Sequence, residues 1–340
     1  MKVAITGGAG FIGSNLVHFL SKERPEWELT VLDALTYAGN LKNISTLIDD
    51  RKVAFERIDI SDAAAVDAFF AAQEIEMVFH LAAESHVDRS IESAGAFVQT
   101  NVLGTQVLLT AAMAHSVKRF VHISTDEVYG SLGPTGVFTE MTPLDPTSPY
   151  AASKAASDLM ALAAYKTHGL DVVVTRCTNN YGPYQFPEKL IPLFISNALE
   201  DKKLPLYGDG SNVRSWIYVD DHSSALLAVA EKGASGSVYN IGGPGDGEVT
   251  NRVVTESILQ ALDKPESLIE YVTDRPAHDL RYAVSIEKIE QELGWSPEVS
   301  FEDGMQRTVA WYLENKPWWQ EIKSGDYMDY YERHYGSRGV

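Results

Sequence analysis

The chain has 340 residues, 45% of them hydrophobic and 22% charged, which is typical of a globular protein with a substantial core. Its 28 Lys and Arg residues stand against 47 Asp and Glu residues, and the formal net charge of −19 excludes nucleic acid and anionic membranes as expected partners. The single cysteine, Cys177, excludes an intrachain disulfide and a cysteine-based metal site. No apolar run approaches the roughly 18 residues of a membrane span, and we expect a cytoplasmic protein.

The first half of the chain alternates short β-branched segments with helical segments. We expect strands at residues 3–6, 29–32, 53–58, 77–81, 120–124 and 172–175, and helices at 12–22, 63–72, 97–114 and from 150 onward. This alternation is typical of α/β proteins with a Rossmann-type, doubly wound parallel sheet. The sequence therefore predicts such a sheet over residues 1–178.

The regular alternation ends near Cys177, where Gly and Pro begin to interrupt the sequence, as in Tyr181-Gly182-Pro183-Tyr184. We expect a smaller, irregular C-terminal domain over residues 179–340. It should contain a helix at 226–231 and a strand at 238–241, and segments from about 211–243 should return to the main sheet. The aromatic residues between 311 and 335 are expected to pack against the protein.

Three glycines, Gly7, Gly10 and Gly13, follow the first expected strand as G-x-x-G-x-x-G. Glycine permits a tight turn and a close approach of the backbone to a pyrophosphate, whose charge the next helix N-terminus stabilises. Asp33 ends the second expected strand and would accept hydrogen bonds from a ribose diol, which favours NAD over NADP. The alternative is a glycine-rich turn without a ligand, but strand, glycines, helix and acid all fall in register.

Tyr150 and Lys154 are spaced to lie on one face of a helix. A lysine ammonium beside a phenol lowers the phenol pKa, so that Tyr150 could act as a base near neutral pH. Asp126 and Glu127 follow an expected strand and would supply a carboxylic acid and a carboxylate. Taken alone, the acids fit a solvated turn and the Tyr/Lys pair fits an exposed helix surface. Their occurrence with the glycine motif favours a redox enzyme with an acid/base step.

These motifs resemble the extended short-chain dehydrogenase/reductase family, through T-G-G-A-G-F-I-G at 6–13 and Y-x-x-x-K at 150–154. Within that family, segments 35–41, 82–90, 124–130 and 179–192 are similar to those of the dTDP-glucose 4,6-dehydratases. The similarity also includes Arg275-Pro276 and His278-Asp279. The Thr-Asp-Glu sequence at 125–127 is the most specific part, because epimerases of the superfamily generally lack the acid pair.

The resemblance implies that dTDP-glucose loses water and becomes dTDP-4-keto-6-deoxyglucose, a precursor of deoxysugars such as rhamnose. Tyr150, assisted by Lys154, would take the 4-hydroxyl proton while NAD accepts the C4 hydride, and Thr125 would hydrogen-bond that hydroxyl. Glu127 would remove the C5 proton as Asp126 protonates the departing 6-hydroxyl, and hydride would then return to C6. This mechanism needs no metal.

Together, the motifs and the resemblance give a full set of expected contacts. The expected NAD contacts are Gly7, Gly10, Phe11, Ile12, Gly13, Asp33, Leu35, Thr36, Asp59, Ile60, Leu81, Ala82, Ala83, Ser85, Thr100, Tyr150, Lys154 and Asn179. The expected substrate contacts, mostly in the C-terminal domain, are Ser85, Thr125, Asn180, Glu188, Lys189, Leu190, Pro205, Tyr207, Arg214, Asn251, Arg275 and His278. Lys189, Arg214 and Arg275 would supply the cations for a diphosphate.

Several alternatives stay open. Ser215 stands where the family has Asp, and Ala277 where Gly is usual, so a dehydratase that acts on UDP- or CDP-glucose is one alternative. A nucleotide-sugar epimerase would not need Asp126 and Glu127, and a non-catalytic NAD-sensing protein would not need Tyr150 either. The Asp220-Asp221-His222 sequence resembles a metal trio, but we interpret it as a helix start that Asp caps. The apolar face of the 97–114 helix is expected to be either core or part of a helix bundle in a homodimer.

Overall fold

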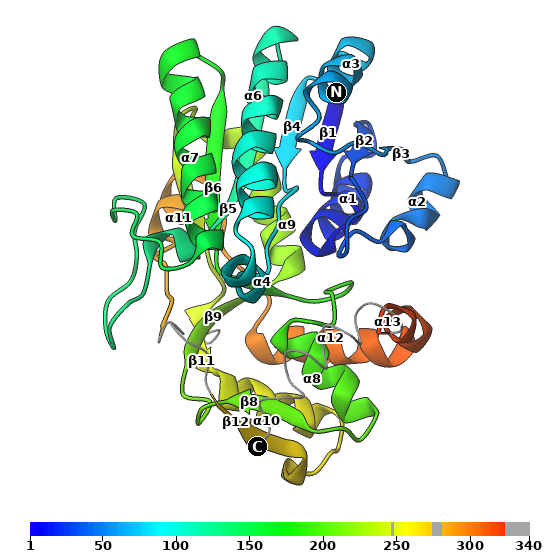
Figure 1. Ribbon diagram of the computed structural model, residues 1–340, viewed down its shortest axis with the longest axis vertical. Coiled ribbons are helices and arrows are strands. Elements are labelled where there is room, and N and C mark those ends of the chain that lie inside the picture. The colour runs from blue at the N-terminus through cyan, green and yellow to red at the C-terminus, as the bar shows by residue number, and fades with distance from the viewer. Residues whose placement is uncertain (246–247, 274–280, 324–340) are drawn as a thin grey trace.

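The computed structural model describes residues 1–245, 248–273 and 281–323. Its largest element is a seven-stranded sheet in which every pairing is parallel (Figure 1). In spatial order the strands are β10 (Val238–Ile241), β6 (Val172–Cys177), β5 (Arg119–Thr125), β4 (Met77–His80), β1 (Lys2–Thr6), β2 (Glu28–Leu32) and β3 (Val53–Glu56). The strand order reverses between β1 and β4, as in Rossmann folds, and the predicted fold class is confirmed.

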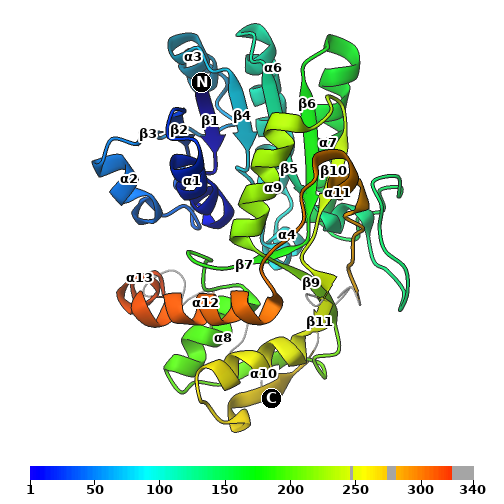
Figure 2. The same cartoon turned by 180° about the vertical axis from the view of Figure 1, so that it is seen from behind.

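Helices cover both faces of this sheet, which is why its strands are almost continuously apolar. α3 (Ala63–Gln73), α6 (Thr105–Ala114) and α7 (Pro149–His168) lie on the face toward the viewer in Figure 1. α1 (Phe11–Glu23), α9 (Val219–Lys232) and α11 (Glu287–Leu293) cover the opposite face, seen in Figure 2. The two faces bury separate apolar clusters, one with Val3 and Ile5 and the other with Ala4 and Val78.

The expected helix at 97–114 is present but is not uniform. It comprises α5 (Gly95–Phe97), a π-helical segment η2 (Val98–Gly104) and then α6. The π-helical segment carries Asn101, whose Oδ1 accepts a 2.8 Å hydrogen bond from the Glu84 backbone N–H and whose Nδ2 donates to Ser153 Oγ at 2.8 Å. This segment therefore links the loop after β4 to α7 beside the cavity described below.

Two segments from the second half of the chain lie with the large sheet. β10 pairs with β6, and α9 packs against α1. By contrast, β9 (Val213–Tyr218) lies between β7 (Asn179–Tyr181) and β11 (Glu248–Thr250) in a separate three-stranded sheet. The segment 211–243 is thus divided between the two parts of the molecule.

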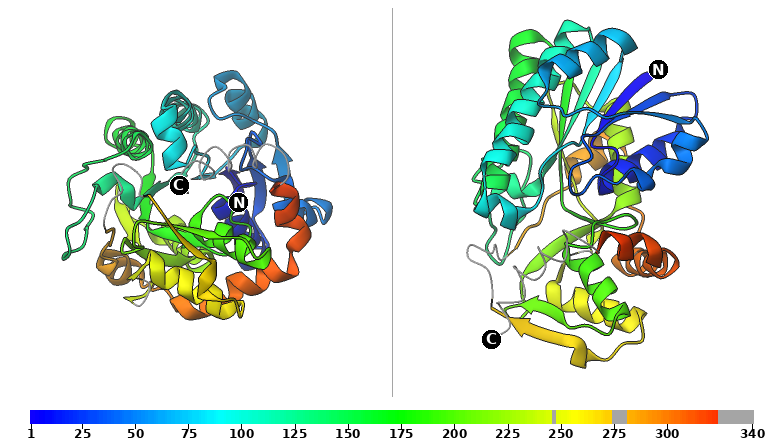
Figure 3. Two further views of the ribbon diagram at one scale, coloured as in Figure 1. Left: turned by 60° about the horizontal axis from the view of Figure 1, so that its bottom comes forward. Right: turned by 45° about the vertical axis from the view of Figure 1, so that its right-hand side comes forward.

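The smaller part lies below the carboxyl ends of the main strands (Figure 3). It holds the three-stranded sheet, a pair formed by β8 (Leu204–Tyr207) and β12 (Ile269–Val272), and a core around Tyr181 and Trp216. Its helices are α8 (Leu190–Leu199), α10 (Asn251–Ala261), α12 (Phe301–Glu314) and α13 (Lys316–Ile322). We did not predict these four helices. In α8 the helical period is hidden, because almost every residue is apolar and buried.

The described part of the aromatic tail packs, as expected. Trp311 and Trp318 contact Tyr184, and Trp319 is 1% exposed. Residues 324–335 of that prediction lie outside the described residues. The remaining short helices are η1 (Leu41–Asn43), α2 (Ser45–Asp49), α4 (Val87–Glu92), η3 (Asp126–Tyr129) and η5 (Glu266–Leu268).

Candidate active site

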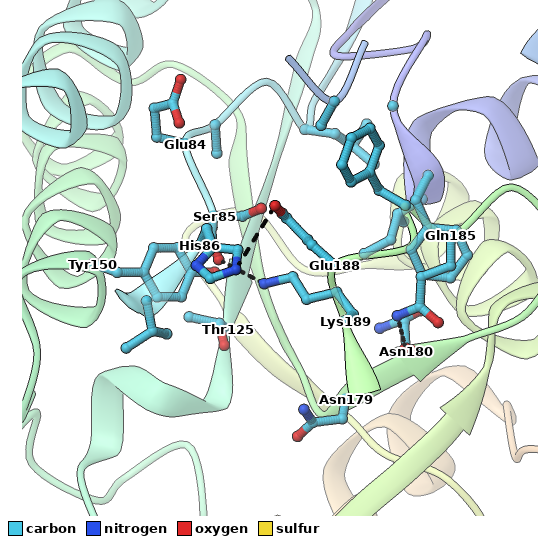
Figure 4. A pocket seen from close by; sticks show the side chains of 18 of the residues that line it. Glu84, Ser85, His86, Thr125, Tyr150, Asn179, Asn180, Gln185, Glu188 and Lys189 are labelled. Atoms are coloured by element: carbon cyan, nitrogen blue, oxygen red, sulfur yellow. Dashed lines mark hydrogen bonds and ion pairs between the residues drawn. The ribbon is translucent and has the colours of Figure 1, made fainter. Parts of the chain in front are cut away.

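A cavity of about 480 Å³ lies where the strand order of the large sheet reverses. Its walls come from the carboxyl ends of the main strands on one side and from α8, β8 and β9 on the other. In open α/β sheets this crevice is the usual ligand site. Figure 4 shows side chains from both parts of the molecule converging on it.

The glycine turn at the end of β1 is built for close contact. Gly7 has a φ of +71°, and a Cβ at Gly13 would lie 2.1 Å from the Gly7 carbonyl oxygen, so a larger residue fits at neither position. The following helix, α1, has no side-chain cap, and Gly10, Phe11, Ile12 and Gly13 at its start all line the cavity. A helix N-terminus of this kind attracts phosphate.

Asp33 ties this turn to the end of β2. Its two carboxylate oxygens accept hydrogen bonds from the backbone N–H groups of Ala9 at 3.0 Å and Leu35 at 2.8 Å. Burial raises the pKa of Asp33, and these two hydrogen bonds partly offset that rise. Asp33 lines the cavity, but Leu35 does not. The expected contact of Leu35 with a cofactor is therefore not supported by its position, since its backbone serves Asp33 instead.

The five expected catalytic residues meet in one wall of the cavity. Thr125 ends β5, Asp126 and Glu127 begin η3, and Tyr150 and Lys154 lie in the first turns of α7. The Thr125 hydroxyl donates to Asp126 Oδ1 at 3.2 Å and accepts from the Glu127 backbone N–H at 3.3 Å. The second carboxyl oxygen of Asp126, Oδ2, is buried without a hydrogen-bond partner among the described residues.

Asp126 has the chemistry of an acid at neutral pH. Burial, followed by the charge of Glu127, raises its pKa from 3.8 to about 7, against the lowering effects of the Thr125 hydrogen bond and the Arg214 charge. A carboxyl group with a pKa near the working pH can both hold and release a proton. The acid role that the sequence suggested for this position is therefore chemically available.

The pairing of Tyr150 with Lys154 differs from our expectation. Burial raises the pKa of Tyr150 well above 10, with smaller raising effects from Glu127 and Cys177, and a hydrogen bond with Thr125 opposes the shift. Lys154 donates from Nζ to the Ile123 carbonyl oxygen at 2.8 Å. The expected phenol pKa near neutrality is thus wrong for this arrangement, because desolvation by burial dominates it.

The opposite wall carries the expected substrate contacts. Lys189, just before α8, donates from Nζ to the Ser85 carbonyl oxygen at 3.2 Å, and Glu188 Oε2 lies 3.7 Å from His86 Nε2 (Figure 4). The same Glu188 oxygen lies 3.5 Å from Arg89 Nη2. These contacts join the two parts of the molecule across the cavity. Burial raises the pKa of Glu188, which its cationic neighbours oppose.

Arg214, in β9, is the second expected cation on this wall. Its guanidinium carbon lies 4.7 Å from the centre of the Tyr282 ring, and it is close enough to Asp126 to lower the pKa of that carboxyl group. Ser215, the residue that departs from the family pattern, is buried beside it in the strand. The site therefore combines an acidic catalytic wall with a cationic substrate wall.

All but three of the NAD and substrate contacts that we predicted from the sequence line the cavity, including Thr36, Asp59, Thr100, Asn179 and Asn251. The three are Leu35, discussed above, and Arg275 and His278, which lie outside the described residues. Several further residues line the cavity that we did not predict, among them Glu84, His86, Gln185, Trp216 and Tyr282. A signal for His86 was available, because it lies within the segment 82–90 that carried the resemblance.

Asp220-Asp221-His222 begins α9, as predicted, but the expected capping is wrong. No side chain caps the helix, and Asp221 Oδ2 instead accepts from the backbone N–H groups of Glu298 at 3.2 Å and Val299 at 2.9 Å. Within residues 1–245, 248–273 and 281–323, no group of three or more His, Cys, Asp or Glu side chains is placed to bind a metal. The same ranges hold no helix with both the length and the apolar character of a membrane span.

Comparison with known proteins places this site in a family. A family model described as GDP-mannose 4,6 dehydratase matches residues 4–308. The dTDP-glucose 4,6-dehydratase of Streptomyces niveus is 51% identical over 330 residues, covering 96% of this chain and 97% of that protein. The crystal structure of DesIV, a dTDP-glucose 4,6-dehydratase from Streptomyces venezuelae with NAD bound, matches with a TM-score of 0.91 and 51% identity, over 95% of this chain and 100% of that one.

A more distant relative shares the fold but carries another name. UDP-glucose 4-epimerase from Thermus thermophilus, solved in complex with NAD, matches with a TM-score of 0.86 at 32% identity, over 93% of this chain and 100% of that one. The architecture is thus common to dehydratases and epimerases, whereas identity near 50% along nearly the whole chain is shared with the dehydratases. The chain therefore belongs to the dTDP-glucose 4,6-dehydratases, within the extended short-chain dehydrogenase/reductase family.

Proposed function

We propose that this protein is an NAD-dependent hydro-lyase that converts dTDP-glucose to dTDP-4-keto-6-deoxyglucose. The observation that carries the proposal is the acid pair that follows β5, in which the buried Asp126 has a pKa of about 7 beside the half-buried Glu127. An enzyme that only inverts or oxidises a hydroxyl group has no use for a second acid that can protonate a leaving group. Elimination of water needs such an acid, because the departing hydroxyl group must be protonated.

The residues around the glycine turn fit NAD. Gly7, Gly10 and Gly13 leave room for a pyrophosphate, and the uncapped start of α1 faces it. Asp33, anchored by two backbone hydrogen bonds, would accept from the ribose diol, and the expected adenine contacts Asp59 and Ile60 line the same cavity. NAD would supply a hydride acceptor that returns its hydride, and a positive nicotinamide charge that favours the ionised form of a nearby phenol.

On the catalytic wall, each side chain has one proposed task. Tyr150 would remove the proton of the sugar 4-hydroxyl, which Thr125 would orient by a hydrogen bond. The ketone that forms at C4 acidifies the C5 hydrogen, and Glu127 would abstract it. Asp126 would protonate the departing 6-hydroxyl through Oδ2, the oxygen without a hydrogen-bond partner among the described residues.

The cationic wall would hold the nucleotide. The protein has a formal net charge of −19, which would repel an anionic diphosphate. Lys189 and Arg214 line the cavity and would attract the diphosphate by their positive charges. Pro205, Leu206 and Tyr207 would enclose the base, with Asn251 beside them. Arg275 and His278 remain proposed contacts on the basis of the resemblance alone.

Nucleotide choice is the point at which an alternative has support. Ser215 stands in β9 beside Arg214, where the resemblance leads us to expect Asp, so UDP- and CDP-glucose belong in the same assay. Purified protein is incubated with dTDP-, UDP-, CDP- and GDP-hexoses without added NAD, and the alkaline absorbance of a 4-keto product is followed. We expect a 4-keto product from dTDP-glucose. Because no NAD is added, this turnover depends on NAD that co-purifies with the protein. Epimerised hexose without a 4-keto product would exclude the proposal in favour of an epimerase.

We also propose that two copies associate through α4, η2 and α7. Several large apolar side chains on this side of the molecule are exposed, namely Ile91, Val98, Leu103 and Leu159, at 56%, 55%, 44% and 59%. Such an exposed apolar surface is typical of a homodimer that completes a helix bundle. Sedimentation of the wild type and of Leu159→Glu tests this, with a dimer expected only for the wild type.

The single buried cysteine fits a cytoplasmic location, which we retain as a proposal.

A further inference from the structure

His222, in the first turn of α9, is fully buried and is not among the residues that line the cavity. Its Nδ1 lies 2.8 Å from Oδ1 of Asn180, which comes from β7 and does line the cavity. The sequence offered His222 only as part of an apparent metal trio or a helix start. The contact with Asn180 gives it a different role.

The direction of this hydrogen bond follows from the chemistry of the two groups. With the oxygen of the Asn180 amide facing the ring, Nδ1 of His222 must carry the proton, because an amide oxygen can only accept. The other end of the same amide is fixed independently, because Nδ2 of Asn180 lies 3.0 Å from the Thr178 carbonyl oxygen, which can also only accept. Exchanging the amide N and O of Asn180 would set its oxygen against the Thr178 carbonyl oxygen and lose that hydrogen bond. The amide of Asn180 therefore has a single favourable orientation.

That orientation turns the NH2 group of Asn180 toward the cavity wall. Nδ2 lies 3.5 Å from Cys177 Sγ as well as beside Thr178, and both of these residues line the cavity. The oxygen end points instead to His222, outside the lining. The backbone of Asn180 is held as well, since Gln185 Nε2 donates to its carbonyl oxygen at 3.0 Å.

We propose that His222 is a positioning residue that keeps the amide NH2 group of Asn180 toward the cavity, where it meets the anionic diphosphate of the substrate. The inference rests on the proposed function, because it takes the ligand to be a nucleoside-diphosphate sugar. An N–H donor attracts a phosphate oxygen, whereas an amide oxygen in the same place would repel it. In the low dielectric of a buried site the difference between the two orientations is large.

The neighbouring acids do not compete for His222. Asp221 is engaged by the backbone N–H groups of Glu298 and Val299, which fixes the segment before α12. Nε2 of His222, the acceptor nitrogen in this tautomer, is buried without a hydrogen-bond partner among the described residues. Burial lowers the pKa of His222 to about 3, so the ring is neutral at working pH and its one proton stays on Nδ1.

The test is a double-mutant cycle between His222 and Asn180. His222→Leu removes the donor, while His222→Asn keeps an amide N–H near the position of Nδ1. Binding of dTDP is measured by calorimetry, and KM and kcat are measured with dTDP-glucose. We expect His222→Leu to raise the Kd of dTDP and the KM about tenfold with kcat within about twofold, as fits the loss of one hydrogen bond. His222→Asn should restore most of the affinity, and His222→Leu should have no further effect in an Asn180→Ala background.

The contrary results are equally specific. A purely structural role for His222 predicts that His222→Leu weakens dTDP binding by the same factor with or without Asn180, and that His222→Asn does not help; either result overturns the inference. Should His222→Leu not fold, Asn180→Asp tests the same geometry, because it places an oxygen where the NH2 group was. We expect its Kd to rise at least as much as that of Asn180→Ala, and wild-type affinity for dTDP would refute the inference.

The cycle also separates this inference from the proposed function. A wild type that binds dTDP but makes no 4-keto product removes the proposed function, while the Kd values of the cycle still decide the role of His222. A wild type that binds none of dTDP, UDP, CDP and GDP overturns the inference itself.

Discussion

Lys154 Nζ donates a 2.8 Å hydrogen bond to the carbonyl oxygen of Ile123, near the carboxyl end of β5. The ammonium group is thereby held against the sheet, one turn after Tyr150 in α7. Burial lowers the pKa of Lys154, and the negative charge of Asp158, one turn later, opposes this effect. Lys154 thus connects the carboxyl end of β5 with the buried charge of Asp158.

Replacing Lys154 should impair catalysis more than folding. We expect Lys154→Met to reduce kcat by about 10²-fold or more, because the cavity loses a cation that would favour the ionised form of a substrate or cofactor group. The methionine retains the packing of the alkyl chain, so the melting temperature should change by only a few degrees. Steady-state kinetics and thermal denaturation measured together check this. A Lys154→Met variant with normal kcat would show that the Ile123 contact is only structural.

The acid pair should be needed for elimination rather than for oxidation at C4. Asp126→Asn keeps the hydrogen bond that the Thr125 hydroxyl donates but cannot supply a proton to the 6-hydroxyl. We expect a loss of about 10²–10⁴-fold in formation of the 4-keto-6-deoxy product, the usual worth of a general acid. Single-turnover measurements of NADH absorbance should still show oxidation of the sugar. Glu127→Gln should behave alike, and normal turnover by the double variant would contradict the assignment.

Asp126 should also make stability depend on pH. Its pKa rises from 3.8 to about 7 on folding, so between those values the folded protein binds more protons than the unfolded chain. The free energy of unfolding therefore falls as pH rises from about 4 to about 7, by on the order of 4 kcal/mol from this group. Asn at position 126 has no charge to bury. Chemical denaturation at pH 5 and pH 8 should show a stability gain of Asp126→Asn over wild type at pH 8, and a much smaller gain at pH 5.

A buried ion pair behind the catalytic wall should be important for folding. Arg176 Nε donates to Asp158 Oδ2 at 2.9 Å, and His122 Nε2 lies 3.2 Å from Asp158 Oδ1, with all three side chains almost fully buried. These partners hold the pKa of Asp158 below its usual value despite burial. We expect Arg176→Met to lower the free energy of unfolding by about 3–5 kcal/mol, because Asp158 is left as an unpaired buried charge.

The matched control for that variant lies at the surface. Arg252 forms an exposed ion pair with Glu256 at 2.7 Å, one turn apart in α10. Arg252→Met should change the free energy of unfolding by less than about 1 kcal/mol. Equal losses for the two variants in urea denaturation would rule out burial as the cause.

Much of the Rossmann-type part of the molecule could be predicted from local sequence. Each main strand ends within two residues of its expected end, since parallel strands buried on both faces have a continuous apolar pattern. Gly7 and Gly13 could be assigned because only glycine fits their backbone geometry. The lower part of the molecule could not be predicted so well, because α8 is apolar on all sides and carries Pro192 near its start.

Other features depended on contacts between distant segments. Nothing near position 101 indicates a π-helical segment, and nothing near position 222 indicates that His222 faces Asn180. The pKa of Asp126 depends on burial and on the charges of Glu127 and Arg214, and only the first of these charges is near in sequence. Such properties arise from the packing of side chains separated by many residues.

The sequence by itself determined the Rossmann-type sheet, the glycine turn, Asp33 and the side chains for which we propose catalytic roles, because each follows from backbone sterics or from residue type at a fixed spacing. Only the tertiary structure decided that burial raises the pKa of Tyr150, and that the Asp126 carboxyl group titrates near neutrality. Both results have one physical reason. The cost of placing charge in a low-dielectric interior depends on how the whole chain surrounds that charge.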